Sequence, residues 1–161
     1  MIKINLITVG KLKEQYWRDA VAEYSKRLGA FCKLEIIELN ESKLPDEPSE
    51  KQKLAALQSE AKAMEPYLSA KGAFNFAMCI EGKQMTSEKL SQKLDSCGAN
   101  GYSTISFIIG SSFGISEDIK TRADVRLSMS EMTFPHQLAR VMLIEQIYRA
   151  FQISAHTKYH K

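Results

Sequence analysis

The sequence predicts one α/β domain built around a mostly parallel sheet. Runs of β-branched and other apolar residues alternate with segments that repeat their apolar side chains at helical spacing, from one end of the chain to the other. No low-complexity linker, internal repeat or break in composition divides the 161 residues. A hydrophobic content of 44% is enough for one core of ordinary domain size and too high for a disordered chain.

The first two elements are a strand and a helix. Residues 2–9 are β-branched and alternate in polarity, and Gly10 supplies a turn signal after them. Residues 14–28 carry apolar side chains at helical spacing, with Gly29 where a C′ glycine belongs. We therefore expect a strand, a turn and a helix in this order.

A second strand and a long helix follow. Residues 31–39 are typical of a strand, and a polar, proline-containing loop comes after them. Ser49 is the expected N-cap of a helix, because Gln52 stands three residues later as a capping-box partner. This helix should run to about Leu68, with Pro66 disturbing its last turn.

The second half repeats the alternation. Ser116 is the expected N-cap of a helix whose first residues, Glu117 and Asp118, complement the helix dipole. The other expected elements are strands at 73–80, 102–109 and 125–129, a helix at 87–97 closed by Gly98, and a helix at 135–153.

Charge and targeting signals narrow the class of protein. The net charge of +3 is too small for a histone-like or tail-driven nucleic-acid binder, although a local RNA-binding patch stays open. No signal peptide is recognisable, and no apolar run reaches the roughly 18–20 residues of a membrane span. Cys32, Cys79 and Cys97 lack metal-binding or redox spacing, and the first two are interpreted as small buried hydrophobes. We expect a cytoplasmic protein with no membrane and no metal.

Three strand ends are candidate ligand sites, because ligands bind beyond the carboxyl ends of parallel strands. The first strand ends without G-x-G-x-x-G, which argues against a Rossmann-type site there. The turn 110–116 has two glycines and three serines that let backbone approach a ligand, although a plain connection explains it equally well. The segment 130–136 joins a strand end to a proline-initiated helix and is the third candidate.

The helix at 135–153 is apolar around most of its circumference, which indicates cover on two sides and a twofold dimer. Arg140 stands among apolar neighbours, so its guanidinium needs a phosphate or carboxylate partner. Glu145 and Arg149 are interpreted as an ordinary surface ion pair. The polar tail after Ile153 has the composition of a frayed terminus.

Several motifs of the chain resemble the ribosomal RNA large subunit methyltransferase H family. The resemblance extends over the whole chain and is most specific where the motifs combine. They are Ile80-Glu81-Gly82-Lys83, Phe107-Ile108-Ile109-Gly110, Thr133-Phe134-Pro135-His136, Tyr148-Arg149-Ala150 and Tyr159-His160-Lys161.

The resemblance implies a SPOUT-type fold, a parallel-rich sheet flanked by helices with a C-terminal trefoil knot. It implies a homodimer that transfers the methyl group of S-adenosyl-L-methionine to N3 of a pseudouridine in helix 69 of 23S rRNA, acting on assembled ribosomes. It also makes Tyr159 and His160 functional, so one domain would span residues 1–161 with a functional tail from about 154. The implied cofactor-binding residues are Met78, Gly110, Met129, Ser130, Glu131, Met132, Thr133 and Phe134.

The chain departs from the family pattern at a few positions. The family commonly has two glycines where this chain has Gly110 and Ser111, and leucine at Met78. If Ser111 had to adopt a positive φ, strain on the order of 1 kcal/mol would weaken cofactor binding. Lys158 replaces a proline before the terminal Tyr-His pair, which predicts a more mobile tail.

Roles in catalysis follow as hypotheses. His160, or less favourably His136 or Glu131, would assist removal of the N3 proton, and Arg140 would hold an RNA phosphate or stabilise the imide oxygen. The alternatives are a non-catalytic ribosome-binding dimer of the same fold and a SPOUT methyltransferase with another RNA target. Candidate contacts to the RNA backbone are Lys11, Lys13, Lys158 and Lys161.

Overall fold

The computed structural model describes residues 1–160, whose centre is a five-stranded sheet. Every neighbouring pair of strands is parallel, and the strand order is β2-β1-β4-β3-β5. This arrangement confirms the predicted α/β fold with a parallel sheet. The strands are β1 (Lys3–Val9), β2 (Lys33–Leu39), β3 (Ala73–Gln84), β4 (Thr104–Ile109) and β5 (Val125–Ser128).

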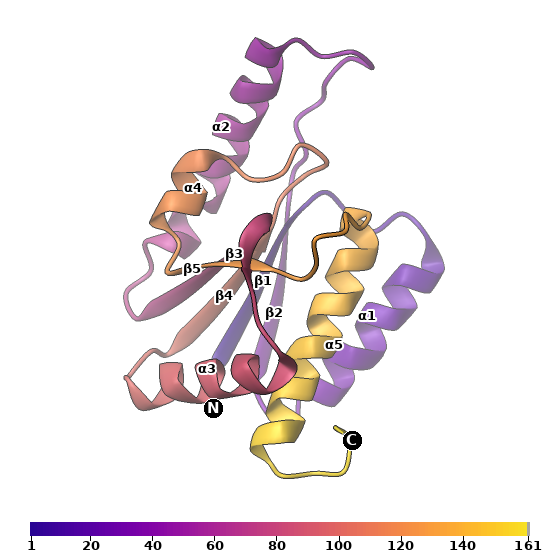
Figure 1. Ribbon diagram of the computed structural model, residues 1–161. Helices are drawn as coiled ribbons and strands as arrows, with labels where there is room; N and C mark the ends of the chain where they lie inside the picture. The colour runs from indigo at the N-terminus through magenta and orange to yellow at the C-terminus, as the bar shows by residue number, and fades with distance from the viewer. Residues whose placement is uncertain (161) are drawn as a thin grey trace.

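Helices cover both faces of the sheet (Figure 1). One face carries α1 (Gln15–Leu28), α3 (Ser87–Ala99) and α5 (His136–Ser154), and the other carries α2 (Glu50–Leu68) and α4 (Glu117–Arg122). Among residues 1–160, no helix combines the length and the apolar character needed to cross a membrane.

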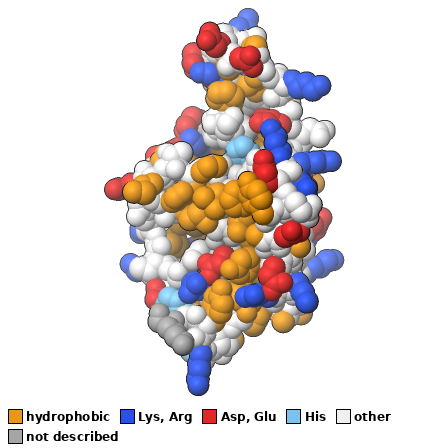
Figure 2. All heavy atoms as spheres, turned by 90° about the vertical axis from the view of Figure 1, so that its right-hand side faces the viewer, with side chains coloured by type: hydrophobic (Ala, Val, Ile, Leu, Met, Phe, Trp, Pro, Cys, Tyr) orange, Lys and Arg blue, Asp and Glu red, His pale blue; other side chains and the backbone are white. Residues whose placement is uncertain are grey.

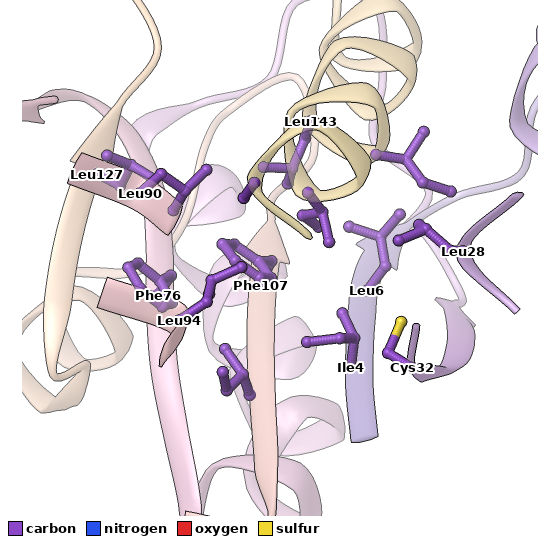
Figure 3. Packing of buried hydrophobic residues seen from close by; sticks show 14 of the residues in the cluster. Ile4, Leu6, Leu28, Cys32, Phe76, Leu90, Leu94, Phe107, Leu127 and Leu143 are labelled. Carbon is purple, nitrogen blue, oxygen red and sulfur yellow. The ribbon is translucent and has the colours of Figure 1, made fainter. Parts of the chain in front are cut away.

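The core is divided by the sheet into two clusters, as the period of two along a strand requires. Ile4, Leu6 and Phe107 point toward Leu143 of α5 in the larger cluster (Figure 3). Ile7, one residue after Leu6, belongs to the smaller cluster beneath α2 and α4. Strands that are apolar on both faces explain why the sequence shows nearly continuous apolar runs.

The observed helix starts agree with the sequence predictions better than the observed helix ends do. The Ser49 side chain accepts from the backbone N–H of Gln52 and completes the expected capping box. Gly10 has the positive φ of a turn, +79°. Gly29, in contrast, ends α1 in a right-handed conformation. Gly98 does not close α3 but lies inside it, and the left-handed residue after this helix is Gly101, at φ +83°.

β3 is longer than the sequence predicts, because it pairs with β5 twice. Phe76–Met78 lie opposite Val125–Leu127, and after a register shift Lys83 and Gln84 lie opposite Leu127 and Ser128. The second segment contains charged residues and a glycine, so no apolar alternation announces it. At Gly82 a Cβ would lie 2.8 Å from the backbone of β5, which only glycine permits.

The three cysteines are free thiols, and the prediction of buried side chains at Cys32 and Cys79 is confirmed for Cys32 only. Cys32 and Cys97 are buried, and Cys79 is half-buried. Burial raises the pKa of Cys32 to about 11, which keeps its thiol protonated at neutral pH.

Candidate functional site

The residues that the resemblance implies for the cofactor meet at one edge of the sheet. β4, β3 and β5 are neighbours in this order, and all three run parallel. Met78 lies in β3 opposite Leu127 of β5, Gly110 directly follows β4, and residues 129–134 directly follow β5. The carboxyl edge of these three strands is therefore the candidate site.

The turn after β4 is closed tightly on itself. The backbone N–H of Gly114 donates to the carbonyl of Ser111 at 2.8 Å. A Cβ at Gly110 would lie 2.0 Å from the carbonyl oxygen of Gly114, and Gly114 itself has φ +84°. Both glycines are therefore required, one by close approach and the other by backbone conformation.

Ser111 does not carry the strain that the sequence suggested. Within residues 1–160, the only non-glycine residue with a positive φ is His156. The Ser111 hydroxyl instead donates to Glu60 Oε2 at 3.2 Å. The serine thus adds a hydrogen bond between the turn and α2 where a glycine would add none.

Glu60 is a buried carboxyl, only 4% exposed. Burial raises its pKa, and the neighbouring Glu41 raises it further. Hydrogen bonds from Ser111 and from the backbone of Ser42 act in the opposite direction.

The loop 129–134 leaves much of its backbone free. Ser128 Oγ donates to the carbonyl of Ser130 at 2.9 Å, and the N–H of Met132 donates to Ser130 Oγ at 3.0 Å. Met129 packs against the larger core cluster, whereas Met132 is 73% exposed. Apart from these two bonds, no hydrogen bond within residues 1–160 is seen to the backbone of residues 129–134, so the other N–H and C=O groups of this loop are available to a ligand.

Arg140 is buried with a carboxylate partner. It is 1% exposed, and its Nη1 donates to Glu38 Oε2 at 2.9 Å while Nη2 donates to the carbonyl of Gly10 at 3.1 Å. Burial lowers the pKa of Arg140, and Glu38 opposes this effect. The guanidinium therefore ties α5 to the ends of β1 and β2, and in this conformation it does not face outward to an RNA phosphate.

The tail packs beside α5. Tyr159 Oη donates to Glu145 Oε1 at 3.2 Å, and its ring centroid lies 4.9 Å from that of Tyr148. Arg149 bonds Glu145 at 2.6 Å and lies over the Tyr159 ring. Burial raises the pKa of Tyr159 to about 12. The Glu145–Arg149 ion pair thus also binds the tail through Tyr159.

His160 is held between two charged groups. Its Nε2 lies 2.6 Å from Glu88 Oε1, and its Nδ1 lies 3.5 Å from Arg149 Nη1. Hydrogen bonds from Thr86 and from the Glu88 backbone, and then the His160 contact, lower the pKa of Glu88 to about 2. The carboxylate is therefore ionised and fixes the orientation of the imidazole.

The tail and the loop 129–134 lie at different levels of α5. Glu145, which holds Tyr159, is nine residues beyond His136, or about 14 Å along the helix. No hydrogen bond within residues 1–160 joins Tyr159 or His160 to the loop 129–134, and Figure 1 shows the chain end far from that loop. The structure therefore brings together the residues that the resemblance implies for the cofactor, but it places the tail apart from them.

The remaining expected residues lie on the surface or near it. Glu131 is exposed and His136 is half-buried. Lys11, Lys13 and Lys158 are exposed, as contacts to an RNA backbone require. Lys161 lies outside the described residues.

Residues 2–160 match the family model described as "Predicted SPOUT methyltransferase", which gives the class of protein. The chain is 52% identical to "Ribosomal RNA large subunit methyltransferase H" of Bifidobacterium adolescentis, over 99% of this chain and 100% of that protein. It is 49% identical to "Ribosomal RNA large subunit methyltransferase H 1" of Clostridium perfringens, with the same coverage. The chain therefore belongs to the ribosomal RNA large subunit methyltransferase H family of SPOUT methyltransferases.

A solved structure supports the fold alone. It is titled "The structure of a probable methylase family protein from Haemophilus influenzae Rd KW20". Its TM-score is 0.53 at 11% identity, and the match covers 99% of this chain and 70% of that one.

Sequence reasoning did not name the carboxylates Glu38, Glu60 and Glu88. Glu38 and Glu88 have partners more than 70 residues away, which no local pattern reveals. Glu60 did leave a signal, because it stands four residues from both Ala56 and Met64 on the buried stripe of α2. A carboxylate on an apolar stripe indicates a buried polar contact.

Proposed function

We propose that this protein methylates N3 of a pseudouridine in helix 69 of 23S rRNA on assembled ribosomes. It would use S-adenosyl-L-methionine and act in the cytoplasm as a homodimer with a knotted C-terminal part. The observation that carries the proposal is the convergence of Met78, Gly110 and residues 129–134 at one sheet edge. Full-length relatives named for methylation of large-subunit ribosomal RNA support the substrate class.

The chain's own residues would act mainly by alignment. The cofactor, when bound, supplies a methyl group already activated on a sulfonium. The Gly110 turn and the loop 129–134 would hold it, so that N3 of the target approaches in line at near-attack distance. The imide N3 must also lose its proton, and His160 is the proposed base because it is the imidazole of the terminal Tyr-His pair that the resemblance makes functional.

A dimer is proposed from an apolar surface. Hydrophobic side chains gather on the face that carries α1 and α5 (Figure 2). Leu138 and Met142 are half-buried, four residues apart on α5, and belong to neither core cluster. A second copy of the chain would cover them. Since the tail does not reach the cofactor loop of its own chain, His160 would act either after leaving Glu88 or on the site of the second subunit.

The decisive experiment is a methylation assay with assembled ribosomes and with free 23S rRNA, followed by mass-spectrometric mapping. We expect one methyl group on N3 of a helix-69 pseudouridine, and only on ribosomes. Methylation elsewhere would favour the SPOUT enzyme with another target. No binding of S-adenosyl-L-methionine at millimolar concentration in calorimetry would favour the non-catalytic dimer.

The variant His160→Ala tests the proposed role of His160 in removing the N3 proton. We expect the methylation rate to fall about tenfold or more, while cofactor affinity and oligomeric state stay unchanged. His156→Asn is the matched control, because it changes a nearby exposed histidine and asparagine tolerates its φ of 54°. An unchanged rate in His160→Ala would contradict the assignment.

A further inference from the structure

A concave site adjoins the candidate cofactor site. A hollow of about 310 Å³ lies between the segment 41–45 after β2, helix α2 and the turn 110–114. Ser111 lines it, directly after Gly110. Figure 1 shows the segment after β4 passing near α2 and the chain that leads into it. A volume near the lower end of the range for ligand sites suits one planar group rather than a whole nucleotide cofactor.

The rim of the hollow is aromatic and cationic. Phe113 lines it and is 42% exposed. Lys53 Nζ lies 5.7 Å from the centroid of the Phe113 ring, and Lys43 lines the hollow from the other segment. An exposed ring with lysines nearby is typical of surfaces on which an unpaired base stacks while its phosphates meet the cations.

The wall of the hollow is acidic. Glu41 and the buried Glu60 both line it, so a phosphate group inside it would be repelled. A neutral planar group with hydrogen-bond donors on its edge fits these carboxyl groups. Among nucleobases, adenine, cytosine and guanine carry an exocyclic amino group that a carboxylate can accept from, and uracil does not.

We infer that this hollow holds an unpaired base of the RNA substrate next to the methylated nucleotide, stacked on Phe113 with its amino edge toward Glu41 and Glu60. The inference rests on the proposed function and adds a contact that selects the substrate. Because Gly110 and Ser111 are consecutive, the turn that supports the cofactor also supports this base. Occupation of the hollow would thus align the target beside the methyl group.

The test compares variants of Phe113 in the full-length protein, with assembled ribosomes as substrate. We expect Phe113→Ala to lower kcat/KM for ribosomes about tenfold, mainly through KM, as the loss of one base stack predicts. Phe113→Trp should retain activity, whereas Phe113→Leu should behave like the alanine variant, because leucine restores apolar volume but not stacking. Cofactor affinity, measured by calorimetry, should be unchanged in all three variants. Leu54→Ala is the matched control, since Leu54 is 58% exposed on α2 and does not line the hollow.

The outcomes separate this inference from the proposed function. An active wild type whose Phe113→Ala and Phe113→Leu variants keep the wild-type KM would overturn the base site alone. The base site alone would also be overturned if the variants lost cofactor affinity in step with activity, because Phe113 would then only support the turn. A wild type that methylates no ribosomal RNA would overturn the proposed function and the base site with it. A selective increase in KM for the alanine and leucine variants supports the inference.

Discussion

Single residues set the shape of the candidate site, and Ser111 is the most instructive of them. From the sequence, a serine beside Gly110 suggests backbone strain. In the structure the left-handed position is Gly114, and Ser111 is free to bond Glu60. Which residue of a turn carries the positive φ depends on how the turn closes, and composition alone does not determine that.

Gly110→Ala tests the close approach in this turn. The added Cβ would lie 2.0 Å from the Gly114 carbonyl oxygen, so the turn has to open. A displacement of the order of 1 Å at a reacting centre predicts a loss in methylation rate of about a hundredfold, with weaker cofactor binding in calorimetry. Gly98→Ala is the control, because nothing lies within 4 Å of its Cβ and alanine favours a helix by roughly 0.5–1 kcal/mol. Equal activity of the two variants would contradict the role of Gly110.

Glu60→Gln tests the burial of this carboxyl through the pH dependence of stability. Its folded pKa is raised above the ordinary 4.5, so above that folded pKa the native state has to hold a buried charge that the unfolded chain keeps in water. We expect the variant to be more stable than the wild type at pH 7–8, and this gain to vanish as pH falls to about 4.5. Urea unfolding at several pH values measures the difference.

Glu65→Gln supplies the opposite trend for comparison. Hydrogen bonds from Arg122, then Ser69, lower the pKa of Glu65 to about 2. The wild type should therefore be the more stable protein above pH 4.5, and its advantage should be lost between pH 4.5 and about 2. If the stability differences of the two variants from the wild type changed with pH in the same direction, burial of Glu60 would not be the cause of the pH dependence in Glu60→Gln.

At the scale of elements, the sequence predicts what is local and misses what is distant. Periodicity located the helices and strands, and the Ser49 and Ser116 caps marked helix starts, because these signals depend on residues three or four apart. The second pairing of β3 with β5 joins residues more than 40 positions apart and includes a charged segment. No local pattern encodes that pairing, so the strand was predicted too short.

Ser49→Ala tests the start of α2, the helix that carries Glu60. Ser49 Oγ accepts from the Gln52 N–H at 3.2 Å, and Gln52 Oε1 accepts from the Ser49 N–H at 2.8 Å. Loss of the cap predicts a decrease of about 1 kcal/mol in the free energy of unfolding. Ser59→Ala, an exposed change in the middle of the same helix, should stabilise slightly through helix propensity. Chemical denaturation that ranks the two variants in the reverse order would contradict the capping argument.

At the scale of the whole molecule, the structure brings together the residues that the resemblance implies for the cofactor, but it places the tail elsewhere. Gly110 and the loop 129–134 follow β4 and β5, and Met78 lies in β3 between these two strands, so their convergence is a consequence of sheet order. The tail is held in place by contacts with the side chains of Glu145, Tyr148 and Glu88. No periodic pattern encodes such contacts of single side chains. A site that needs both parts is therefore completed only by movement or by a second chain.

Met142→Glu tests whether a second chain covers α5. The side chain is half-buried and outside both core clusters, so a carboxylate there can reach water in a monomer but would be buried in the proposed interface. We expect light scattering coupled to gel filtration to show a dimer for the wild type and a monomer for the variant, with an unchanged circular dichroism spectrum. Leu54→Glu places the same charge on α2, on the opposite face of the sheet, and should remain dimeric. If Met142→Glu stays a dimer, α5 is not the contact, and the completion of the site by a second subunit through this face is excluded.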